Sequence, residues 1–442
     1  MTGEPRQPNI VGIDVDDLFG SYSYKLRPND ANQPHQLLLL YGDNGAGKST
    51  ISQLLFHSLS RDKGRGHRTF LAETMFRRFA VHFSSGTTFT AIREKNELVG
   101  PYALIGKSED GQERRADVTT QEDGSVRDEN ISDEALGAVL DICLPHPQRT
   151  YFLSDERVLT SDEFSDDLRS QYEHEMMLVE KRGRLIERRV SKETNVDASV
   201  SRAERWLKEQ AYSASDRGEE STAAVYQEIV GRIAKAPVEA KGESSSCISE
   251  IVEKFASIEK RSIQFRRFGL SHAEGLGTLH EQLINLPANK HELVSSVLEP
   301  YAASLNSKLD ANEITKQRLE TFLDIANDFY KRKTVEITVS GGIRVIGDDG
   351  RLLKIRLLSS GEKQLMLLLC NILCATNHPS LFIVDEPEIS LNVKWQRKLV
   401  SSLLRLCDRS DVQFIMATHS IEVLSEHNDS VMKLEDQNKS NG

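Results

Sequence analysis

The sequence has few of the features that would place a protein in a membrane or in an oxidising compartment. No run approaches the roughly 20 apolar residues that a membrane-spanning helix requires, and the start of the chain lacks the apolar core of a signal peptide. The cysteines form an odd set without disulfide-like or zinc-like spacing: Cys143, Cys247, Cys370, Cys374 and Cys407. We therefore expect a soluble, cytoplasmic protein with no membrane partner.

Positive charge is also in short supply. Lysine and arginine number 56 against 67 aspartates and glutamates, which gives a formal net charge of −11. This balance disfavours a generally basic nucleic-acid-binding surface, although it leaves a local patch open. At 442 residues the chain is long enough for two or three domains.

A glycine-rich loop of the form G-x-x-x-x-G-K-S occupies residues 42–49, between an apolar run and an apolar-periodic segment. Its glycines would let successive backbone N–H groups point at phosphates, at the positive end of the following helix. Lys48 would bridge the β- and γ-phosphates, and the Ser49 hydroxyl would bind Mg²⁺. The predicted nucleotide-binding residues here are Asp43, Asn44, Gly45, Ala46, Gly47, Lys48, Ser49 and Thr50. The alternative is a glycine-rich turn that happens to precede a helix.

A second motif lies far downstream, where four apolar residues at 381–384 end in Asp385, Glu386 and Pro387. This pattern is typical of a buried parallel strand that emerges at its carboxyl end. Asp385 would hold Mg²⁺, and Glu386 would orient and polarise the attacking water. A simple turn after a strand is the alternative interpretation.

Two further motifs complete the pattern. Ser360, Gly361 and Glu362 open an apolar helical run, 24 residues before Asp385 counting from Gly361. His419 follows another apolar strand, 34 residues after Asp385. Four motifs in this order and at these spacings resemble the ABC-type ATPases, of the SMC-, RecF- and overcoming-lysogenisation-defect-like kind.

That resemblance implies a mixed α/β fold: a head with a P-loop sheet and an antiparallel β subdomain, carrying a large α-helical insertion. It also implies ATP and Mg²⁺ as cofactors and a homodimer, which could build into a higher oligomer. In this family the signature helix caps the γ-phosphate held by a second subunit, which gives Ser360, Gly361 and Glu362 their expected role. His419 would contact the γ-phosphate. Many relatives carry histidine where Asn392 stands, so the resemblance gives that side chain no clear role.

The motifs divide the chain into three predicted parts. Residues 1–160 form a first ATPase lobe with the phosphate loop, and residues 331–442 form a second lobe with the other three motifs. Between them, residues 161–330 show helical periodicity and high charge, which predicts a bundle or short coiled-coil arm. Within the first lobe we expect strands at 10–13, 18–24, 87–94 and 101–106 and an exposed loop over 107–134. Gln148 is the nearest candidate for a glutamine that links the nucleotide to the helical region.

The sequence further resembles the ATPases of prokaryotic anti-phage defence systems such as PARIS and Septu, through residues 385–392 and Leu18-Phe19-Gly20. That likeness implies an ATP-driven sensor or scaffold that controls a toxic effector. Because 23 residues follow His419, we expect any nuclease to be supplied in trans by another chain. An SMC- or RecF-like ATPase of DNA repair or chromosome maintenance is the alternative, since it shares all four motifs. A transporter ATPase would have no use for the large insertion.

Overall fold

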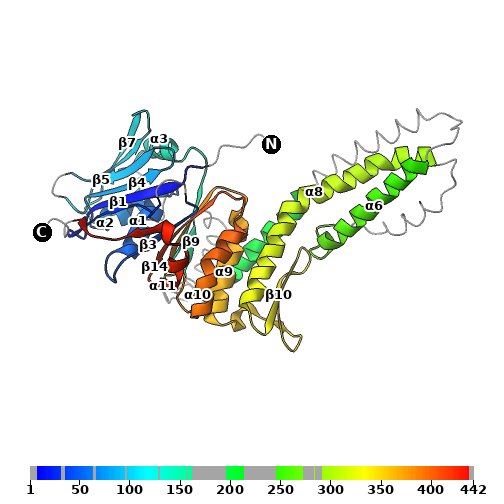
Figure 1. The fold of residues 1–442 in the computed structure, drawn as a ribbon. Helices are drawn as coiled ribbons and strands as arrows, with labels where there is room; N and C mark the ends of the chain where they lie inside the picture. The colour runs from blue at the N-terminus through cyan, green and yellow to red at the C-terminus, as the bar shows by residue number, and fades with distance from the viewer. Residues whose placement is uncertain are drawn as a thin grey trace, which may run out of the picture. The chain divides into compact units, whose positions relative to one another are not determined.

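The structure is a computed structural model of the chain that describes residues 7–30, 35–62, 66–94, 97–127, 130–156, 158–161, 196–213, 245–271, 283 and 291–437. It divides into two compact units (Figure 1). The first unit combines residues 1–195 with 375–442, and the second comprises residues 196–374. The three-part division expected from the sequence stays a prediction.

The first unit contains a mixed sheet that carries the carboxyl-terminal strands of the chain. In spatial order its strands are β15 (Val431–Lys433), β3 (Leu37–Tyr41), β14 (Val412–Thr418), β13 (Ser380–Asp385), β8 (Arg149–Leu153) and β9 (Leu159–Ser161). All neighbours pair in parallel except β8 and β9. Every residue of β13 and β14 is buried, as expected for strands covered on both faces.

A second, antiparallel sheet lies in the same unit. Its order is β2 (Tyr22–Leu26), β1 (Ile10–Leu18), β4 (Arg78–Phe83), β5 (Thr88–Ile92), β6 (Tyr102–Lys107) and β7 (Glu113–Val118). The strands expected near 87–94 and 101–106 correspond to β5 and β6. The strand expected over 18–24 is interrupted, because residues 19–21 form the turn between β1 and β2.

The prediction of an exposed loop over residues 107–134 was also wrong in part, because this segment contains β7. Four of the six β7 residues are exposed, and only Ala116 and Val118 are buried. These two small residues join the apolar core beneath helix α3 (Asp133–Cys143). A strand with one charged face and two small buried residues gives a weak hydrophobic signal, and this explains why its sequence resembles a loop.

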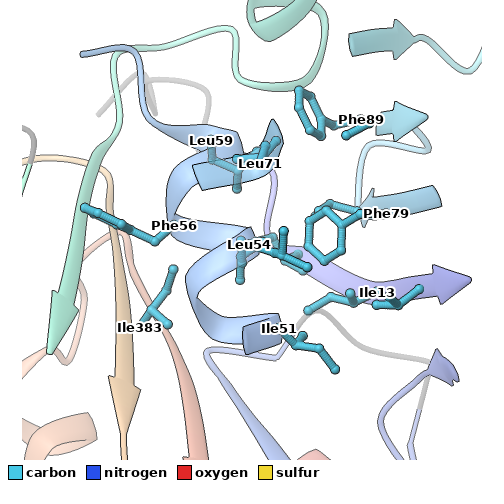
Figure 2. Close-up of a cluster of buried hydrophobic side chains, with 14 of the residues drawn as sticks. Ile13, Ile51, Leu54, Phe56, Leu59, Leu71, Phe79, Phe89 and Ile383 are labelled. Carbon is cyan, nitrogen blue, oxygen red and sulfur yellow. The ribbon is translucent and has the colours of Figure 1, made fainter. Parts of the chain in front are cut away.

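Helix α1 (Lys48–Leu59) lies between the two sheets and is followed by helix α2 (His67–Glu73). Figure 2 shows Leu54 beside Phe79 of the antiparallel sheet, whereas Phe56 lies on the other side of the helix, as does Ile383 of the mixed sheet. The ring of Phe56 also stacks on Phe152, with centroids 5.6 Å apart. Because α1 is packed on opposite sides, its apolar residues do not form a single stripe. This packing fixes the start of the helix, where the phosphate loop ends.

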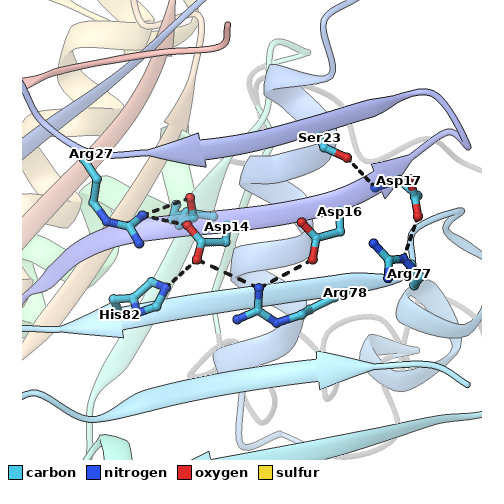
Figure 3. Close-up of polar contacts among 9 residues, drawn as sticks. Asp14, Asp16, Asp17, Ser23, Arg27, Arg77, Arg78 and His82 are labelled. Carbon is cyan, nitrogen blue, oxygen red and sulfur yellow. Dashed lines mark hydrogen bonds and ion pairs between the residues drawn. The ribbon is translucent and has the colours of Figure 1, made fainter. Parts of the chain in front are cut away.

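The outer face of the antiparallel sheet carries a network of charged residues (Figure 3). Asp14 accepts hydrogen bonds from Arg27 and His82, each 2.8 Å long. Arg78 also lies near Asp14 and Asp16. Burial raises the pKa of Asp14, but the hydrogen bonds from His82 and Arg27 outweigh this effect and lower the pKa to about 2. This carboxylate therefore stays ionised on a sheet face that is otherwise accessible to solvent.

The second unit begins with a helix over residues 196–213 and continues with α6 (Ser245–Arg266) and α8 (His291–Phe329). Lys254 pairs with Glu299, Arg261 hydrogen-bonds Asn306, and Lys316 donates to Gln264. Because later residues of α6 contact later residues of α8, the two helices run in the same direction (Figure 1). These helices lie within residues 161–330, the segment for which helical periodicity was predicted. Residues 162–195, 214–244, 272–282 and 284–290 of that segment lie outside the described residues.

A small antiparallel sheet follows in the second unit, with strands β10 (Lys333–Thr338), β11 (Gly342–Gly347) and β12 (Leu352–Leu353). A short 3-10 helix, η3 (Ile355–Leu357), leads into α9 (Ser360–Ala375). After β13 the first unit also contains α10 (Val393–Leu406), α11 (Ile421–Glu426) and the 3-10 helix η4 (Asn428–Ser430). Over the described part of the chain, no helix combines the length and apolar character needed to cross a membrane.

Candidate nucleotide site

Three strands of the mixed sheet end side by side at their carboxyl termini. β14 pairs in parallel with β3 on one side and with β13 on the other. The phosphate loop follows β3, His419 follows β14, and Asp385 ends β13. Ligands in open α/β sheets bind at such carboxyl edges. The topology therefore brings together three motifs that lie far apart in the sequence.

The phosphate loop depends on glycine at specific positions. Residues 42–47 connect β3 to α1, and Lys48, Ser49 and Thr50 form the first turn of the helix. Gly47 adopts a φ of 93°, and a Cβ there would lie 2.7 Å from Leu18 Cδ2. The hydroxyl of Tyr24 donates a 2.9 Å hydrogen bond to the carbonyl of Ala46 and so ties the loop to the antiparallel sheet. The N-terminus of α1 is thus fixed at the end of a buried strand, as an anion-binding helix start requires.

Lys48 is buried within this edge. Its Nζ donates to the carbonyls of Gly42 and Asp43, at 3.0 and 3.2 Å, and contacts Nε2 of His419. Burial lowers the pKa of Lys48, while the nearby carboxylates of Glu386 and Asp385 act in the opposite direction. The ammonium group of Lys48 therefore lies close to a group of carboxylates, which favour its charged form.

Asp385 is buried and shares a hydrogen bond with Ser49. Its second oxygen, Oδ1, has no hydrogen-bond partner among the described residues. Burial raises the pKa of this carboxyl. A buried carboxylate oxygen beside a serine hydroxyl fits Mg²⁺, which takes one or two protein oxygens and completes its shell with phosphates and water. In the described part of the chain, no cluster of three or more histidine, cysteine or acidic side chains could hold a metal by itself.

Glu386 follows directly, in a left-handed conformation with a φ of 51°. Its Oε1 lies 3.2 Å from Nε2 of His419. Burial, followed by the charges of Glu388 and Asp385, raises the pKa of Glu386 to about 6. Burial and Lys48 lower the pKa of His419. This arrangement places the Glu386 carboxylate next to an imidazole whose lowered pKa favours the neutral form.

Two acidic residues at this edge were missed by the sequence analysis. Glu388 accepts hydrogen bonds from the backbone of His419 and Ser420 and from the Thr418 hydroxyl. Asp155 follows β8, and its charge contributes to the raised pKa values of Asp385 and Glu386. The signal for Asp155 was available, because the apolar residues 151–153 at the end of β8 are followed, after Ser154, by Asp155 and Glu156.

Gln148, in contrast, is not at the site. It precedes β8, and its Oε1 accepts a hydrogen bond from Gln7. In a parallel sheet the amino end of a strand lies at the edge opposite the carboxyl ends. The prediction that Gln148 links the nucleotide to the helical region was therefore wrong. Asn392 is the N-cap that precedes helix α10, and its side chain accepts a hydrogen bond from the Trp395 backbone, so a helix cap accounts for that residue.

The predicted signature residues begin helix α9 in the second unit. Ser360 is exposed at the helix start, whereas Gly361 and Glu362 are buried. The Glu362 carboxylate accepts a hydrogen bond from the Ser359 backbone and pairs with Lys333, each at 2.7 Å. Ser359 and Glu362 thus form a capping box. These contacts explain the position of the Glu362 side chain without a bound nucleotide. The nucleotide-binding roles of Ser360, Gly361 and Glu362 stay predictions.

The sheet order and the phosphate loop after β3 define a P-loop ATPase fold of the mixed α/β class. Residues 37–425 match the model of a family described as "AAA domain, putative AbiEii toxin, Type IV TA system". The match spans more than half of the 442 residues, and the chain belongs to this family.

Solved structures of Smc head domains are also similar to the chain. One is the Smc head domain of Pyrococcus furiosus with an extended coiled coil, bound to the C-terminal domain of ScpA. It is 14% identical, with a TM-score of 0.36 and coverage of 96% of this chain and 95% of that one. Another is an Smc head bound to the C-winged helix domain of ScpA, at 12% identity and a TM-score of 0.37, with coverage of 98% and 100%. No curated protein matches the chain.

Proposed function

We propose that this protein binds ATP with Mg²⁺ and hydrolyses it to ADP and phosphate. The observation that carries the proposal is the convergence of Lys48, Asp385, Glu386 and His419 at the carboxyl edge of β3, β14 and β13. These are the charged and polar groups that phosphoryl transfer requires: a cation on the phosphates, a metal ligand, and a carboxylate to orient water.

Each residue has a defined task in this proposal. The backbone N–H groups of residues 43–50 cradle the phosphates at the start of α1, and Lys48 exchanges its carbonyl contacts for the β- and γ-phosphates. Ser49 and Asp385 would hold Mg²⁺, which would supply positive charge to neutralise the phosphates. Glu386 accepts a proton from the attacking water. His419 contacts the γ-phosphate, and its position 3.2 Å from Glu386 supports a role at the same reacting centre.

The second part of the proposal concerns a second copy of the chain. Ser360 is exposed at the start of α9, where helix N–H groups can receive an anion. We infer that Ser360 and Gly361 cap the γ-phosphate held by a partner subunit, so that two ATP molecules join two heads. ATP binding then assembles the homodimer and hydrolysis releases it.

The third part is the biological role, in which the ATPase controls an effector on another chain. The family description refers to a putative toxin of a type IV toxin–antitoxin system, and this supports a role in bacterial defence. The likeness of residues 385–392 to the PARIS and Septu ATPases supports the same role, with a nuclease as the effector. An SMC- or RecF-like function in DNA maintenance is the alternative, because that class uses the same site.

The test of ATP hydrolysis uses the purified full-length chain. We expect phosphate release from ATP in the presence of Mg²⁺, and loss of that release when the metal is removed with EDTA. Tight ATP binding without any turnover across protein concentrations would contradict hydrolysis. For the effector, the chain is affinity-purified from its native host with and without phage infection. A co-purifying nuclease supports the defence role, and replication or repair proteins support the alternative.

A further inference from the structure

The carboxylate of Glu388 organises the end of β14. Its Oε1 accepts a hydrogen bond from the Thr418 hydroxyl at 2.6 Å and from the backbone N–H groups of His419 and Ser420 at 2.9 and 3.1 Å. Glu388 is only 8% exposed. A buried carboxylate is costly unless donors surround it, and these donors all come from the segment that carries His419.

Glu388 also belongs to the turn that carries Glu386. The Ile389 N–H donates to the Glu386 carbonyl, and the Leu391 N–H donates to the Glu388 carbonyl, so residues 386–391 form a tight turn. The Glu386 N–H donates to the carbonyl of Ala417, near the end of β14. The two catalytic segments are thus joined at two points, through the backbone of Glu386 and through the side chain of Glu388.

This double attachment sets the distance between two side chains that point into the site. Nε2 of His419 lies 3.2 Å from Glu386 Oε1 and also contacts Lys48. The ring itself is one-third exposed, so packing holds it only in part. The backbone hydrogen bonds to Glu388 are therefore among the contacts that determine where the ring can reach.

We propose that Glu388 is a positioning residue for ATP hydrolysis, which fixes the backbone of His419 so that its ring lies against Glu386. The inference rests on the proposed hydrolysis at this site. Glu388 contacts neither the nucleotide nor the attacking water, and it acts only through His419. If Glu388 merely stabilised the fold, the effect of its replacement on kcat would be the same with and without the His419 side chain.

The experiment is a double-mutant cycle on the full-length protein. We expect Glu388→Ala to lower kcat by up to about 10²-fold, the loss that misplacement by about 1 Å can cause. The affinity for ATP should change little, because the phosphate loop and Lys48 are untouched. In a His419→Ala background, Glu388→Ala should lower kcat by less than about twofold, since the group it positions is gone.

Two further variants separate geometry from folding. Glu388→Gln keeps a carbonyl oxygen for the same three donors, so it should recover most of the lost kcat. Glu422→Ala is the matched control, because Glu422 contacts the Ser420 hydroxyl and not the backbone of His419. It should leave kcat within about twofold of the wild type, because it leaves the hydrogen bonds from the His419 and Ser420 backbone to Glu388 in place. Thermal unfolding of each variant shows whether it is folded.

The outcomes are distinct. If Glu388→Ala lowers kcat equally with and without His419, or leaves kcat unchanged, the positioning role is wrong. If Glu388→Ala does not fold, the cycle is run with Thr418→Val, which removes one of the three donors and must then show the same dependence on His419. If the wild-type chain does not hydrolyse ATP at all, the proposed function fails instead.

Discussion

The imidazole Nε2 of His419 lies 3.2 Å from the Oε1 of Glu386, although the two residues follow different strands of the mixed sheet. They meet because β13 and β14 pair in parallel and end together. A neutral imidazole nitrogen can donate to Glu386 or accept from Lys48, but not both at once. The pair can therefore change its hydrogen bonding when Lys48 turns towards phosphates, which would connect nucleotide binding to the proposed catalytic base.

Replacing Lys48 by alanine should abolish tight ATP binding. The substitution removes the ammonium group that would contact the β- and γ-phosphates, a charge-assisted interaction worth about 1.5–3 kcal/mol. We expect an increase in Kd of roughly 10- to 150-fold, measured with a fluorescent ATP analogue. The Lys48 side chain also holds two loop carbonyls, so circular dichroism must confirm an intact fold. An unchanged Kd would show that the loop does not bind phosphate.

Replacing Glu386 by glutamine should leave ATP bound but slow its hydrolysis by about 10²–10⁴-fold. Glutamine keeps the shape of the side chain but cannot accept the proton of the attacking water. The variant should accumulate as an ATP-bound dimer, which light scattering after size-exclusion chromatography can measure. Turnover at the wild-type rate would assign the base elsewhere, with His419 as the next candidate.

Replacing Ser360 by arginine tests the shared site. A bulky cation at the start of α9 fills the expected phosphate position and opposes the positive end of the helix dipole. We expect ATP binding by the monomer to persist, while ATP-dependent dimerisation and hydrolysis are lost. Normal hydrolysis by this variant would contradict the two-subunit site.

A mixture of the Ser360→Arg and Lys48→Ala variants provides the complementary measurement. In a two-fold dimer, the mixed species has one site with both residues intact and one site with both replaced. Partial recovery of phosphate release on mixing would therefore support sites shared between subunits. Activity equal to the sum of the separate variants would argue that each chain works alone.

The Asp14 network on the antiparallel sheet predicts a pH dependence of stability. The folded pKa of Asp14, about 2, is below the ordinary value of 3.8, so its contribution is complete above pH 3.8 and is lost as the pH falls towards 2. Allowing for partial screening by solvent, we expect Asp14→Asn to lower the free energy of unfolding at pH 7 by about 1–2 kcal/mol. The difference from wild type should shrink between pH 4 and pH 2 in urea titrations.

The matched control for that measurement is Asp17→Asn on the same strand. Asp17 pairs with Arg77 at 2.6 Å, but both side chains are more than one-third exposed. An exposed pair contributes about 0–1 kcal/mol, and asparagine tolerates the left-handed backbone at this position. If Asp17→Asn and Asp14→Asn destabilise the protein equally, burial of Asp14 is not the cause of its effect.

The phosphate loop was predictable because its parts are consecutive in the chain. Its glycines permit the backbone conformation, and Lys48 and Ser49 follow within the next two residues, so short-range geometry carries the whole motif. The buried strand before Asp385 was predictable for a similar reason, since a continuous apolar run indicates a strand covered on both faces. The charged outer face of β7 concealed a strand, because only two small residues of that segment enter the core.

The sequence by itself therefore determined the local elements of this protein: a loop shaped for phosphate, acidic strand ends and a helix start. Only the tertiary structure decided that β14 lies between β3 and β13, so that Lys48, His419 and Glu386 share one edge. The parallel pairing of β8 with β13 placed Asp155 at that edge and Gln148 at the opposite one. The hydrogen bonds of Glu388 to the residues after β14 placed Glu388 there as well. The physical reason is that hydrogen bonding between strands is non-local, and many strand orders are compatible with the same run of apolar residues.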